Sequence, residues 1–598
     1  MCYSNSHSAS EKSAVFFMSP LAIIKPYFAE HRFKILVGLL SLIVVDVLQL
    51  VIPRIIKWAV DDLTAMKAEA FSLGMYAGAV AVIAVLIGFF RYVWRLCLLG
   101  TSRRVEEGLR NRLFSHLQTL SSAYFDRTRT GDLMAHATND IQQIRMATGM
   151  GLVALNDAVV MGAAAIGFMA YINLTLTALV LIPMPLIAVC ARFFSRKMHR
   201  RYQAVQASFS DLTEAVRERF AGIRLIKAHN RQAVEAARVE AASMAYLSEN
   251  LRLVKITATF FPMMLLFTNL SMALVLLFGG RQVIRFTITP GDFVAFISYL
   301  ALLTWPMMAL GWVTNLIQRG RASLDRVNVI LETRPVIQDA ADARPVGTPR
   351  GEIVFEAVGF AYPESSSPAL AAIDLRIEAG SVLGIVGPPG SGKTTLLSLI
   401  PRLYDPTAGR IRVDGCDTRQ LRIADLRAAI AGMPQEPFLF AATLRENITF
   451  ADPQVSEERL IEAVRSAALL ETVRGFAQGF DTVVGEKGVM LSGGQKQRVA
   501  LARCLLTDAP VLLLDDPISQ VDFETGEVII RALRRLAGRR TILIASHRLS
   551  ALNFADRIVV LDRGRLTASG SHAELMDASG YYARTYRLQE IEEGRDAA

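Results

Sequence analysis

The sequence predicts a multi-pass α-helical membrane domain fused to a C-terminal α/β domain. The 598-residue chain is 52% hydrophobic, more than a soluble protein of this length usually is, and the apolar excess lies in its first half. From Glu352 onward the pattern changes to short apolar strands, turns and amphipathic helices, which is typical of a soluble α/β domain. The expected boundaries are a polar extension over 1–18, a membrane domain over 19–335, a linker over 336–351, the α/β domain over 352–590 and a tail over 591–598.

Six apolar runs in the first half are long enough to cross a membrane. A helix needs about 20 residues to span the roughly 30 Å of hydrocarbon in a bilayer. A shorter helix over 19–31 is expected to lie at the membrane surface before the first run. The six runs cover 35–58, 74–99, 148–171, 174–194, 254–280 and 288–317.

The connections between these runs set the expected orientation in the cell (inner or plasma) membrane. The long connections 101–147 and 195–253 are rich in Arg and Lys, whereas the short ones around 59–73 and 281–287 carry few. The positive-inside rule therefore places the long connections, both termini and the C-terminal domain in the cytoplasm. We expect the helices to continue into the cytoplasm and to be joined there by small transverse helices near 121–133 and 219–230.

Charge and cysteine content argue against several classes of function. The net charge of +10 fits basic cytoplasmic loops and anion-binding groups. Nucleic-acid binding is not favoured, because the sequence shows no basic region with interleaved aromatic residues. The five cysteines are scattered and form no CxxC pair, so neither a disulfide framework nor a zinc site is expected. The opening 1–17 lacks the basic and apolar regions of a signal peptide, and Met18 is an alternative start to Met1.

The run GPPGSGKT fits the P-loop pattern, with strand-like SVLGIV before it and helix-like TTLLSLI after it. Its glycines let backbone N–H groups turn toward phosphates, and the helix that follows adds the positive end of its dipole. We expect Lys393 to bridge the β and γ oxygens of ATP and Thr394 to ligate Mg²⁺. The predicted phosphate-binding residues are Gly387, Pro388, Pro389, Gly390, Ser391, Gly392, Lys393, Thr394 and Thr395.

A second motif, LSGGQ, opens a helix between the P-loop and the strand-like VLLLDD. Its two glycines expose N–H groups to an anion. Together the motifs resemble the ABC ATPases over residues 352–590, and six spans ahead of one P-loop NTPase domain resemble the half-transporter exporters of that family. The resemblance implies that the chain acts as a dimer, because the signature residues complete the ATP site of a second subunit. These residues are Ser492, Gly493, Gly494 and Gln495.

Four further residues match the family's nucleotide machinery. The resemblance implies that Tyr362 stacks on adenine and that Asp515 holds the metal; stacking of this kind contributes about 1–3 kcal/mol. Gln435 is expected to contact Mg²⁺ and the attacking water, and His547 the γ-phosphate. Residues of these types are usually ordinary surface or core residues when they occur singly, and their places in the series favour the functional interpretation.

Asp516 stands where the family usually carries a catalytic glutamate. A group that orients or deprotonates the attacking water must come within about 2.6–3.2 Å of it. Loss of one methylene withdraws the carboxylate by roughly 1 Å, a displacement that can cost about 10²-fold in rate. We therefore expect the site at Asp516 to bind ATP and to hydrolyse it slowly. The alternative is that a repositioned backbone or a bridging water restores the missing reach.

The segment after Asp516 departs from the family pattern as well. SQVD, Ser519 to Asp522, replaces the usual SALD. The DDPxSxVD form resembles one member of the heterodimeric bacterial exporters of the multidrug-resistance-like ATP-binding subfamily. This resemblance favours a heterodimer with a second half-transporter that supplies the weaker signature. The intact LSGGQ and His547 keep a homodimer open.

The substrate is expected to be an amphipathic or hydrophobic small molecule. Asp46 and Gln49 lie in the first span and Asn156 and Asp157 in the third. Polar groups inside a membrane are costly unless they line a cavity or pair between helices. FFPMM and TWPMMALGW supply adaptable aromatic and Met-rich surface, or else simple packing against lipid and neighbouring helices. The alternatives are a homodimeric flippase for lipids or glycolipids, and a subunit in which ATP gates a channel.

Overall fold

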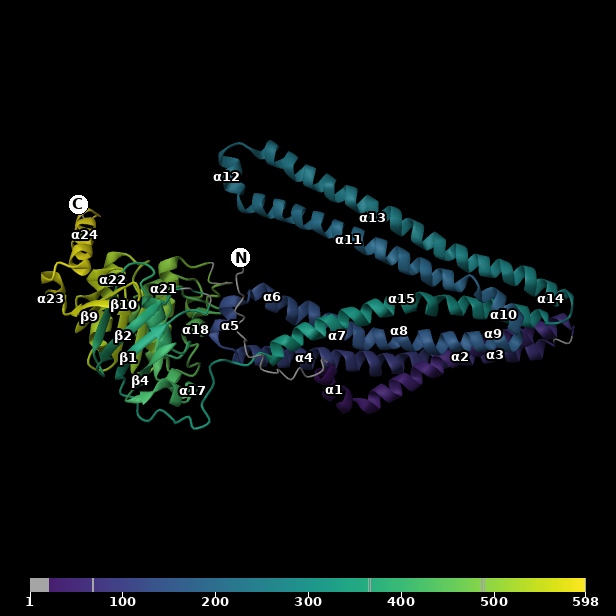
Figure 1. The fold of residues 1–598 in the computed structure, drawn as a ribbon, viewed down its shortest axis with the longest axis horizontal. Coiled ribbons are helices and arrows are strands. Elements are labelled where there is room, and N and C mark those ends of the chain that lie inside the picture. Colours follow the sequence, from purple (N-terminus) through teal and green to yellow (C-terminus); the bar gives the residue numbers. More distant parts are fainter. Residues whose placement is uncertain are drawn as a thin grey trace, which may run out of the picture. The chain divides into compact units, whose positions relative to one another are not determined.

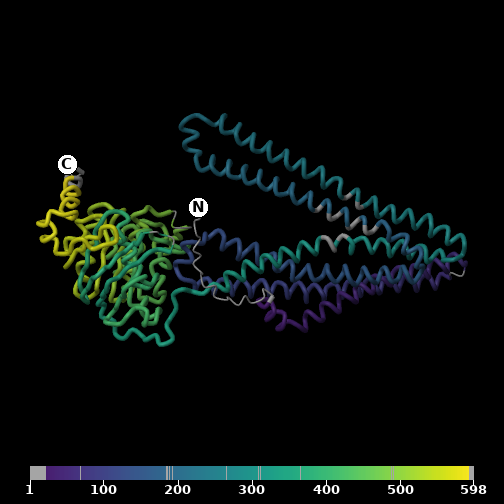
Figure 2. The backbone as a smooth tube through the Cα atoms, viewed as in Figure 1, coloured from purple at the N-terminus to yellow at the C-terminus, as the bar shows by residue number. Residues whose placement is uncertain are grey.

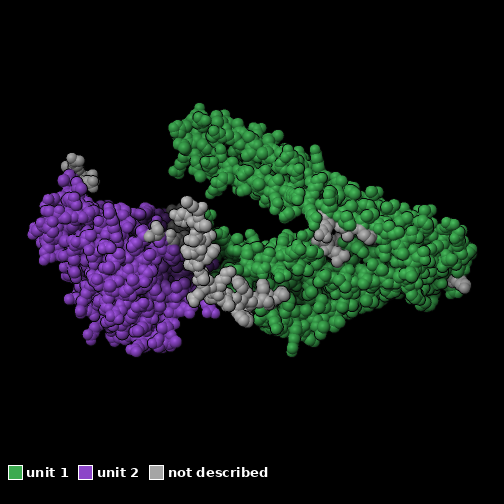
Figure 3. Space-filling model, viewed as in Figure 1, with its two compact units in different colours: residues 1–118, 129–333 green, residues 119–128, 334–598 purple. Residues whose placement is uncertain are grey.

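The computed structural model describes residues 21–66, 69–363, 365, 367–485, 488 and 490–596 (Figure 2). The chain divides into two compact units, one of residues 1–118 and 129–333 and the other of residues 119–128 and 334–598 (Figure 3). Segment 119–128 therefore belongs with the C-terminal unit, although it lies within the membrane domain predicted over 19–335. The polar extension predicted over 1–18 and the alternative start at Met18 lie outside the described residues.

Long helices make up the first unit and account for the hydrophobic excess of the sequence. Among the described residues, five continuous helical stretches are long and apolar enough to cross a membrane. They contain the first, second, third and fifth predicted spans, and the last of them covers the sixth from Pro290 onward (Figure 1). The five stretches are Arg32–Thr64, Ala70–Thr119, Thr130–Ile172, Gln232–Ile284 and Pro290–Glu332.

The fourth predicted span, 174–194, is helical in two pieces separated by a short turn. α10 (Leu174–Leu181) ends in a turn, and α11 (Met184–Ala221) begins after Pro183. Proline lacks the N–H that a continuing helix needs, and its ring clashes with the carbonyl one turn earlier. Pro183 therefore lies at the break between the two helices, in a stretch whose hydropathy is continuous.

Short helices occupy both positions where the sequence predicts transverse helices. α5 (Ser122–Arg127) and α6 (Thr130–Ala135) lie in the first position, and α12 (Ile223–Ala228) lies in the second. α12 joins α11 to α13 (Gln232–Leu274), and these two long helices run side by side (Figure 1).

Single π-helical turns interrupt three of the long stretches without ending them, as such turns commonly do inside α-helices. The remaining elements of this part of the chain are α1 (Leu21–Glu30), α2 (Arg32–Thr64), α3 (Ala70–Trp94), η1 (Arg95–Leu99), α4 (Gly100–Thr119), η2 (His136–Asp140), α7 (Ile141–Met146), η3 (Ala147–Gly151), α8 (Leu152–Asn156), η4 (Asp157–Met161), α9 (Gly162–Ile172), η5 (Val275–Gly279), α14 (Gly280–Ile284) and α15 (Pro290–Glu332).

Apolar side chains from distant segments hold the helices of the first unit together. Phe296 and Tyr299 of α15 are fully buried in one cluster with Leu176 of α10. The Tyr299 hydroxyl donates to the carbonyl oxygen of Leu50 in α2 at 3.0 Å. A buried aromatic ring contributes a large apolar area, and a buried hydroxyl needs a partner of this kind.

The second unit contains two β-sheets. The order β2-β1-β4-β5 forms an antiparallel sheet, and the order β10-β9-β3-β8-β7-β6 forms a sheet whose strands are parallel except β10. β3, β7 and β8 are buried along their whole length, which explains why they are continuous apolar runs in the sequence. The strands are β1 (Ile353–Phe360), β2 (Leu370–Ile377), β3 (Val382–Val386), β4 (Ala408–Val413), β5 (Cys416–Asp417), β6 (Ile430–Met433), β7 (Val511–Asp515), β8 (Thr541–Ala545), β9 (Arg557–Asp562) and β10 (Arg565–Gly570).

Alternate residues of β3 enter two separate cores, because successive side chains of a strand point to opposite faces. Val382 and Val386 belong to one core, and Leu383 and Ile385 to the other. The boundary predicted at residue 590 falls inside a helix, α24. In the described part of this unit, the helices other than α5 are α16 (Lys393–Leu399), η6 (Thr418–Gln420), α17 (Ile423–Ala428), α18 (Leu444–Ile448), α19 (Glu457–Ser466), α20 (Leu470–Arg474), η7 (Gly479–Asp481), α21 (Gly493–Leu506), α22 (Phe523–Leu536), η9 (Leu549–Leu552), α23 (His572–Asp577) and α24 (Tyr581–Asp596).

Candidate functional site

The predicted nucleotide-binding residues follow strands that are neighbours in the six-stranded sheet. The P-loop follows β3, His547 follows β8, Asp515 ends β7 and Gln435 follows β6. In the sheet these strands lie in the order β3-β8-β7-β6. Their carboxyl ends therefore meet at one edge, which is where open α/β sheets bind ligands.

Close contacts in the P-loop leave no room for side chains at two of its glycines. A Cβ on Gly387 would lie 2.1 Å from the carbonyl oxygen of Leu561, and a Cβ on Gly392 would lie 2.7 Å from that of Ala369. Gly392 also has a φ of 103°, which other residues rarely adopt. The hydroxyl of Ser391 is buried and has no hydrogen-bond partner among the described residues. Such an unpaired group is rare in a folded protein and fits a loop that is completed by a phosphate ligand.

Lys393 and Thr394 begin α16 directly after this loop. The Lys393 ammonium donates to the carbonyl oxygens of Gly387 and Pro388 at 2.8 and 3.1 Å. The Thr394 hydroxyl donates to Oδ2 of Asp515 at 2.6 Å. Burial lowers the pKa of Lys393, and burial raises the pKa of Asp515 although Thr394 donates to it.

The pairing of Thr394 with Asp515 fits a magnesium site. A hydroxyl and a carboxylate are hard oxygen donors, and Mg²⁺ in nucleotide sites is held by one or two such groups together with phosphate oxygens and water. Among the described residues, no three His, Cys, Asp or Glu side chains form a cluster that could hold a metal by themselves. The donor set therefore fits a cation that arrives with its nucleotide.

Asp516 is buried and has a φ of 56°, in the left-handed region. A non-glycine residue in this region is strained, and such strain is concentrated at functional sites. Its N–H donates to the carbonyl oxygen of Ala545 at 2.7 Å. Its Oδ1 accepts from the backbone N–H of His547 at 3.4 Å and from the Ser546 hydroxyl at 3.5 Å. The carboxylate is thus held against the end of β8.

The remaining predicted ATP-contacting residues lie around this edge in different ways. The side chains of Gln435 and His547 are exposed. Tyr362 follows β1 of the antiparallel sheet, and its hydroxyl lies 3.1 Å from Oγ1 of Thr395 in α16. Tyr362 is therefore beside the helix that the P-loop leads into.

The signature motif forms the N-terminus of α21. Ser492 is the N-cap residue and exchanges two hydrogen bonds with Gln495, at 3.3 and 2.9 Å. A Cβ on Gly493 would lie 2.0 Å from Oε1 of Gln520, and a Cβ on Gly494 would lie 2.3 Å from its carbonyl oxygen. The two glycines are therefore required by the SQVD segment, which packs directly on them.

Gln497 is a residue of this site that was not predicted from the sequence. This side chain is fully buried on α21. Its amide donates to the carbonyl oxygen of Asp516 at 2.9 Å and to the Ser519 hydroxyl at 2.7 Å, and its Oε1 accepts from the N–H of Gln520 at 3.0 Å. A polar residue on the apolar face of the helix that follows LSGGQ is the signal that would have identified it.

Two of the polar residues predicted in the membrane spans contact each other. The Asn156 amide on α8 donates to Oδ2 of Asp46 on α2 at 3.2 Å, and Asp46 is 2% exposed. Oδ1 of Asp157 is buried and has no hydrogen-bond partner among the described residues. The sequence left two interpretations of these polar residues, lining of a cavity and pairing between helices. The bond between Asn156 and Asp46 is a pairing between helices.

The two units together define a class of protein, a P-loop ATPase fused to a helical membrane domain. Two family models match it: "ABC transporter transmembrane region" over residues 35–307 and "ABC transporter" over residues 370–519.

Relatives match over nearly the whole chain. It is 36% identical to the multidrug resistance-like ATP-binding protein MdlA of Escherichia coli (strain K12), over 96% of this chain and 97% of that protein. It is 32% identical to an ATP-dependent lipid A-core flippase of Chromobacterium violaceum, over 93% and 94% of the two chains. A solved structure described as a bacterial Atm1-family ABC exporter with ATP bound aligns with a TM-score of 0.74 at 27% identity, covering 95% of this chain and 99% of the other.

The chain therefore belongs to the ABC transporter family. It is an ABC exporter half-transporter, in which a helical membrane domain is fused to an ATPase domain whose hydrolysis is coupled to transport. The predicted fold class and the predicted enzymatic activity are confirmed.

Proposed function

We propose that this chain is one subunit of a heterodimeric exporter of amphipathic or hydrophobic small molecules, and that its own ATP site is the slow one of the pair. The observation that carries the proposal is Asp516, a short and buried carboxylate that directly follows the metal-holding Asp515, where the family usually carries a catalytic glutamate. The nucleotide-binding domain and both termini are cytoplasmic in this proposal.

Different residues at the sheet edge bind the phosphates, hold the metal and contact the attacking water. P-loop N–H groups and Lys393 bind the phosphates, while Thr394 and Asp515 would hold Mg²⁺, which offsets the negative charge of the phosphates. Gln435 and His547 contact the attacking water and the γ-phosphate, and their exposed side chains are free to reach a ligand.

Asp516 is poorly placed to activate the attacking water. Its Oδ1 accepts hydrogen bonds from Ser546 and from the backbone of His547, so the carboxylate is held close to the protein backbone. A glutamate would extend about one methylene further toward the ligand, and a displacement of roughly 1 Å can cost about 10²-fold in rate. The site therefore binds ATP and hydrolyses it slowly.

The signature motif is intact, with Ser492 capping α21 and two glycines presenting backbone N–H groups. In a dimer this motif completes the site of the partner, which makes the partner's site the efficient one. Exposed apolar residues in and beside α12 also support a dimer, since a second subunit would cover them. Phe220 is 73% exposed and Leu225 is 64% exposed.

The substrate class rests on two kinds of side chain in the membrane domain. Asp46 and Asn156 supply polar groups in the spans, and Trp305 and Trp312 supply exposed aromatic surface on α15. The relative named as multidrug resistance-like fits an amphipathic substrate. The relative named as a lipid A-core flippase favours a lipid or glycolipid as the second candidate. ATPase stimulation by amphipathic dyes would support the first, and stimulation only by lipid would support the second.

The Asp516→Glu substitution tests the slow site. The purified chain alone should show little ATPase activity, and Asp516→Glu should raise it by about 10²-fold because the longer side chain restores the reach to water. Asp515→Asn in the same background should abolish the gain, because it removes the metal-holding carboxylate. A fully active homodimer with the native aspartate would contradict the proposal.

The Ser492→Arg substitution tests which site turns over in the assembled pair. Arginine at the N-terminus of α21 blocks the signature that serves the partner's P-loop, so steady-state ATPase of the heterodimer should be lost. Ser571→Arg is the matched control, because Ser571 caps α23 with the same capping box outside the ATP site. Hydrolysis that survives Ser492→Arg would show that the efficient site does not use this signature.

A further inference from the structure

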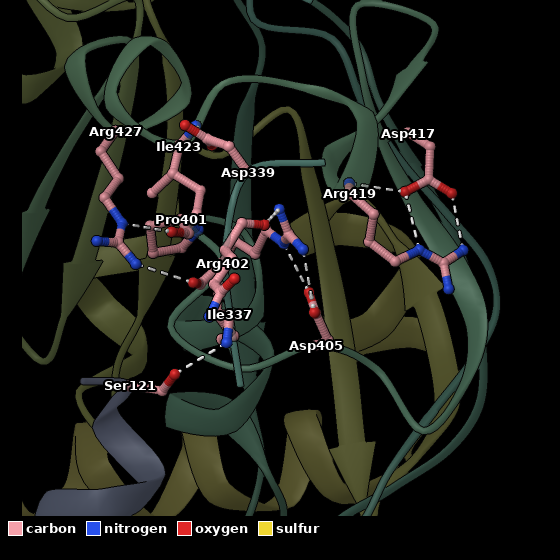
Figure 4. Close-up of polar contacts among 11 residues, drawn as sticks. Ser121, Ile337, Asp339, Pro401, Arg402, Asp405, Asp417, Arg419, Ile423 and Arg427 are labelled. Carbon is pink, nitrogen blue, oxygen red and sulfur yellow. Dashed lines mark hydrogen bonds and ion pairs between the residues drawn. The ribbon is translucent and has the colours of Figure 1, made fainter. Parts of the chain in front are cut away.

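The loop that follows α16, with the sequence PRLYD, is held in place by buried arginine contacts. Arg402 is 6% exposed and has a φ of 53°. Its guanidinium pairs with both carboxylate oxygens of Asp405, at 2.8 and 3.2 Å (Figure 4). It also donates to the carbonyl oxygen of Gln338 at 3.3 Å. Arg427 donates to the carbonyl oxygens of Pro401 and Arg402 at 3.1 and 3.0 Å. The loop is therefore a fixed platform that also holds the linker at Gln338.

The segment that contains α5 lies on this platform, within the same compact unit. The Ser121 hydroxyl accepts from the N–H of Ile337 at 2.9 Å (Figure 4). The Tyr404 hydroxyl donates to Oδ2 of Asp126 in α5 at 2.7 Å. No residue of α5 is buried, so hydrogen bonds of this kind carry much of its attachment.

Tyr404 also contacts the aromatic residue assigned to adenine. Its ring lies edge-on to Tyr362 with centroids 5.6 Å apart, and Phe360 touches both rings at 5.5 and 4.9 Å. Edge-to-face packing at these distances is a favourable and directional contact. A purine that stacks on Tyr362 would therefore contact a ring that packs against Tyr404, and Tyr404 is hydrogen-bonded to α5.

We propose that Tyr404 is a positioning residue that links adenine binding at Tyr362 to the placement of α5 through its hydrogen bond to Asp126. The inference rests on the assignment of Tyr362 to adenine. Burial and the neighbouring Asp126 raise the pKa of Tyr404, so its hydroxyl stays protonated and remains a donor. Because coupling between sites is reciprocal, a displacement of α5 also changes the affinity for nucleotide.

Hydrogen exchange of the α5 amides in the assembled full-length transporter tests this link. In the native protein, the non-hydrolysable analogue AMP-PNP should change exchange over 122–127 several-fold. Tyr404→Phe keeps the ring and loses the hydroxyl, so AMP-PNP should still bind while the change at α5 disappears. If the hydrogen bond only anchors α5, exchange will rise equally with and without nucleotide and the response will persist, which overturns the proposal.

A double-mutant comparison separates a link from two independent defects. Asp126→Ala, which removes the acceptor, and Asp126→Ala with Tyr404→Phe should lose the α5 response to the same extent as Tyr404→Phe alone. Additive losses would contradict a single link. Tyr586→Phe is the matched control, since its hydroxyl bonds to Asn553 in the same unit and away from α5; the response should be unchanged.

The assignment of Tyr362 has a separate readout. Tyr362→Leu should weaken photolabelling of this chain by azido-ATP, because the stacking surface is lost. Unchanged labelling would overturn the adenine assignment, whatever the α5 response of Tyr404→Phe shows. A response of α5 that survives in Tyr362→Leu with nucleotide bound would overturn the link itself.

Discussion

At the scale of single residues, the ATP site depends on polar groups buried beside Asp516. Gln497 bonds to the backbone of Asp516 and to both Ser519 and Gln520, so one side chain fixes the strained aspartate and the segment after it. Gln497 lies on α21, the helix that begins with the signature motif. One hydrogen-bonded network therefore connects the signature helix with Asp516 at the end of β7.

The Gln497→Leu substitution tests this network. Leucine fits the volume but removes three hydrogen bonds: the Gln520 N–H loses its side-chain acceptor, and the carbonyl of Asp516 and the Ser519 hydroxyl keep only their mutual contact at 3.4 Å. An unsatisfied buried group costs about 1–3 kcal/mol. We expect a lower Tm in detergent and a lower ATPase rate for the assembled transporter. Gln478→Leu, at an exposed position, is the control and should leave both unchanged. An unaltered Tm in Gln497→Leu would show that the network is dispensable.

At the scale of elements, the N-terminus of α15 is fastened to the end of α2. The Lys57 ammonium pairs with Asp61 and Asp292, each at 3.0 Å. Oδ1 of Asp61 accepts from the N–H of Gly291 at 2.8 Å. A Cβ on Gly291 would lie 2.3 Å from the backbone oxygen of Lys57. The two helices therefore approach so closely that only glycine fits between them.

The Gly291→Ala substitution should separate these helix ends. The clash is with backbone, which yields less readily than a side chain, so we expect a loss of about 1–3 kcal/mol, typical of overpacking. Thermal unfolding of the purified membrane protein would measure it. Gly280→Ala is the matched control, because a Cβ there meets nothing within 4 Å. Equal Tm values for the two variants would contradict the close approach.

At the scale of the whole molecule, the arginine-rich connections predict which ends of the helices face the cytoplasm. Phe286, in the short connection after α14, is 94% exposed, and Leu225 of α12 is 64% exposed. α12 precedes the long helical stretch Gln232–Ile284 and Phe286 follows it, so the two positions lie at opposite ends of that stretch.

Cysteine labelling tests this orientation. With the five native cysteines replaced, Phe286→Cys should react with a membrane-impermeant maleimide in intact cells. Leu225→Cys should react only after the membrane is permeabilised. The reverse pattern would place α12 outside the cell and would refute the cytoplasmic assignment.

Hydropathy and motif spacing were sufficient for the predictions that depend on local sequence. The long helices, the strand before the P-loop and the helix after LSGGQ depend on apolar length and on turns within a few residues. The turn inside the fourth span was not predicted, because a hydropathy window does not register the N–H group absent from Pro183.

The sequence by itself determined that this chain is a membrane protein with an attached ATPase, and it identified the short carboxylate at position 516. Only the tertiary structure decided which residues meet. Thr394 reaches Asp515, and Tyr404 reaches Asp126 from a position 278 residues away. The first contact follows from the order of strands in the sheet, and the second from the packing of segment 119–128 within the C-terminal unit. Neither is encoded in local periodicity, because each depends on burial that arises only when distant segments come together.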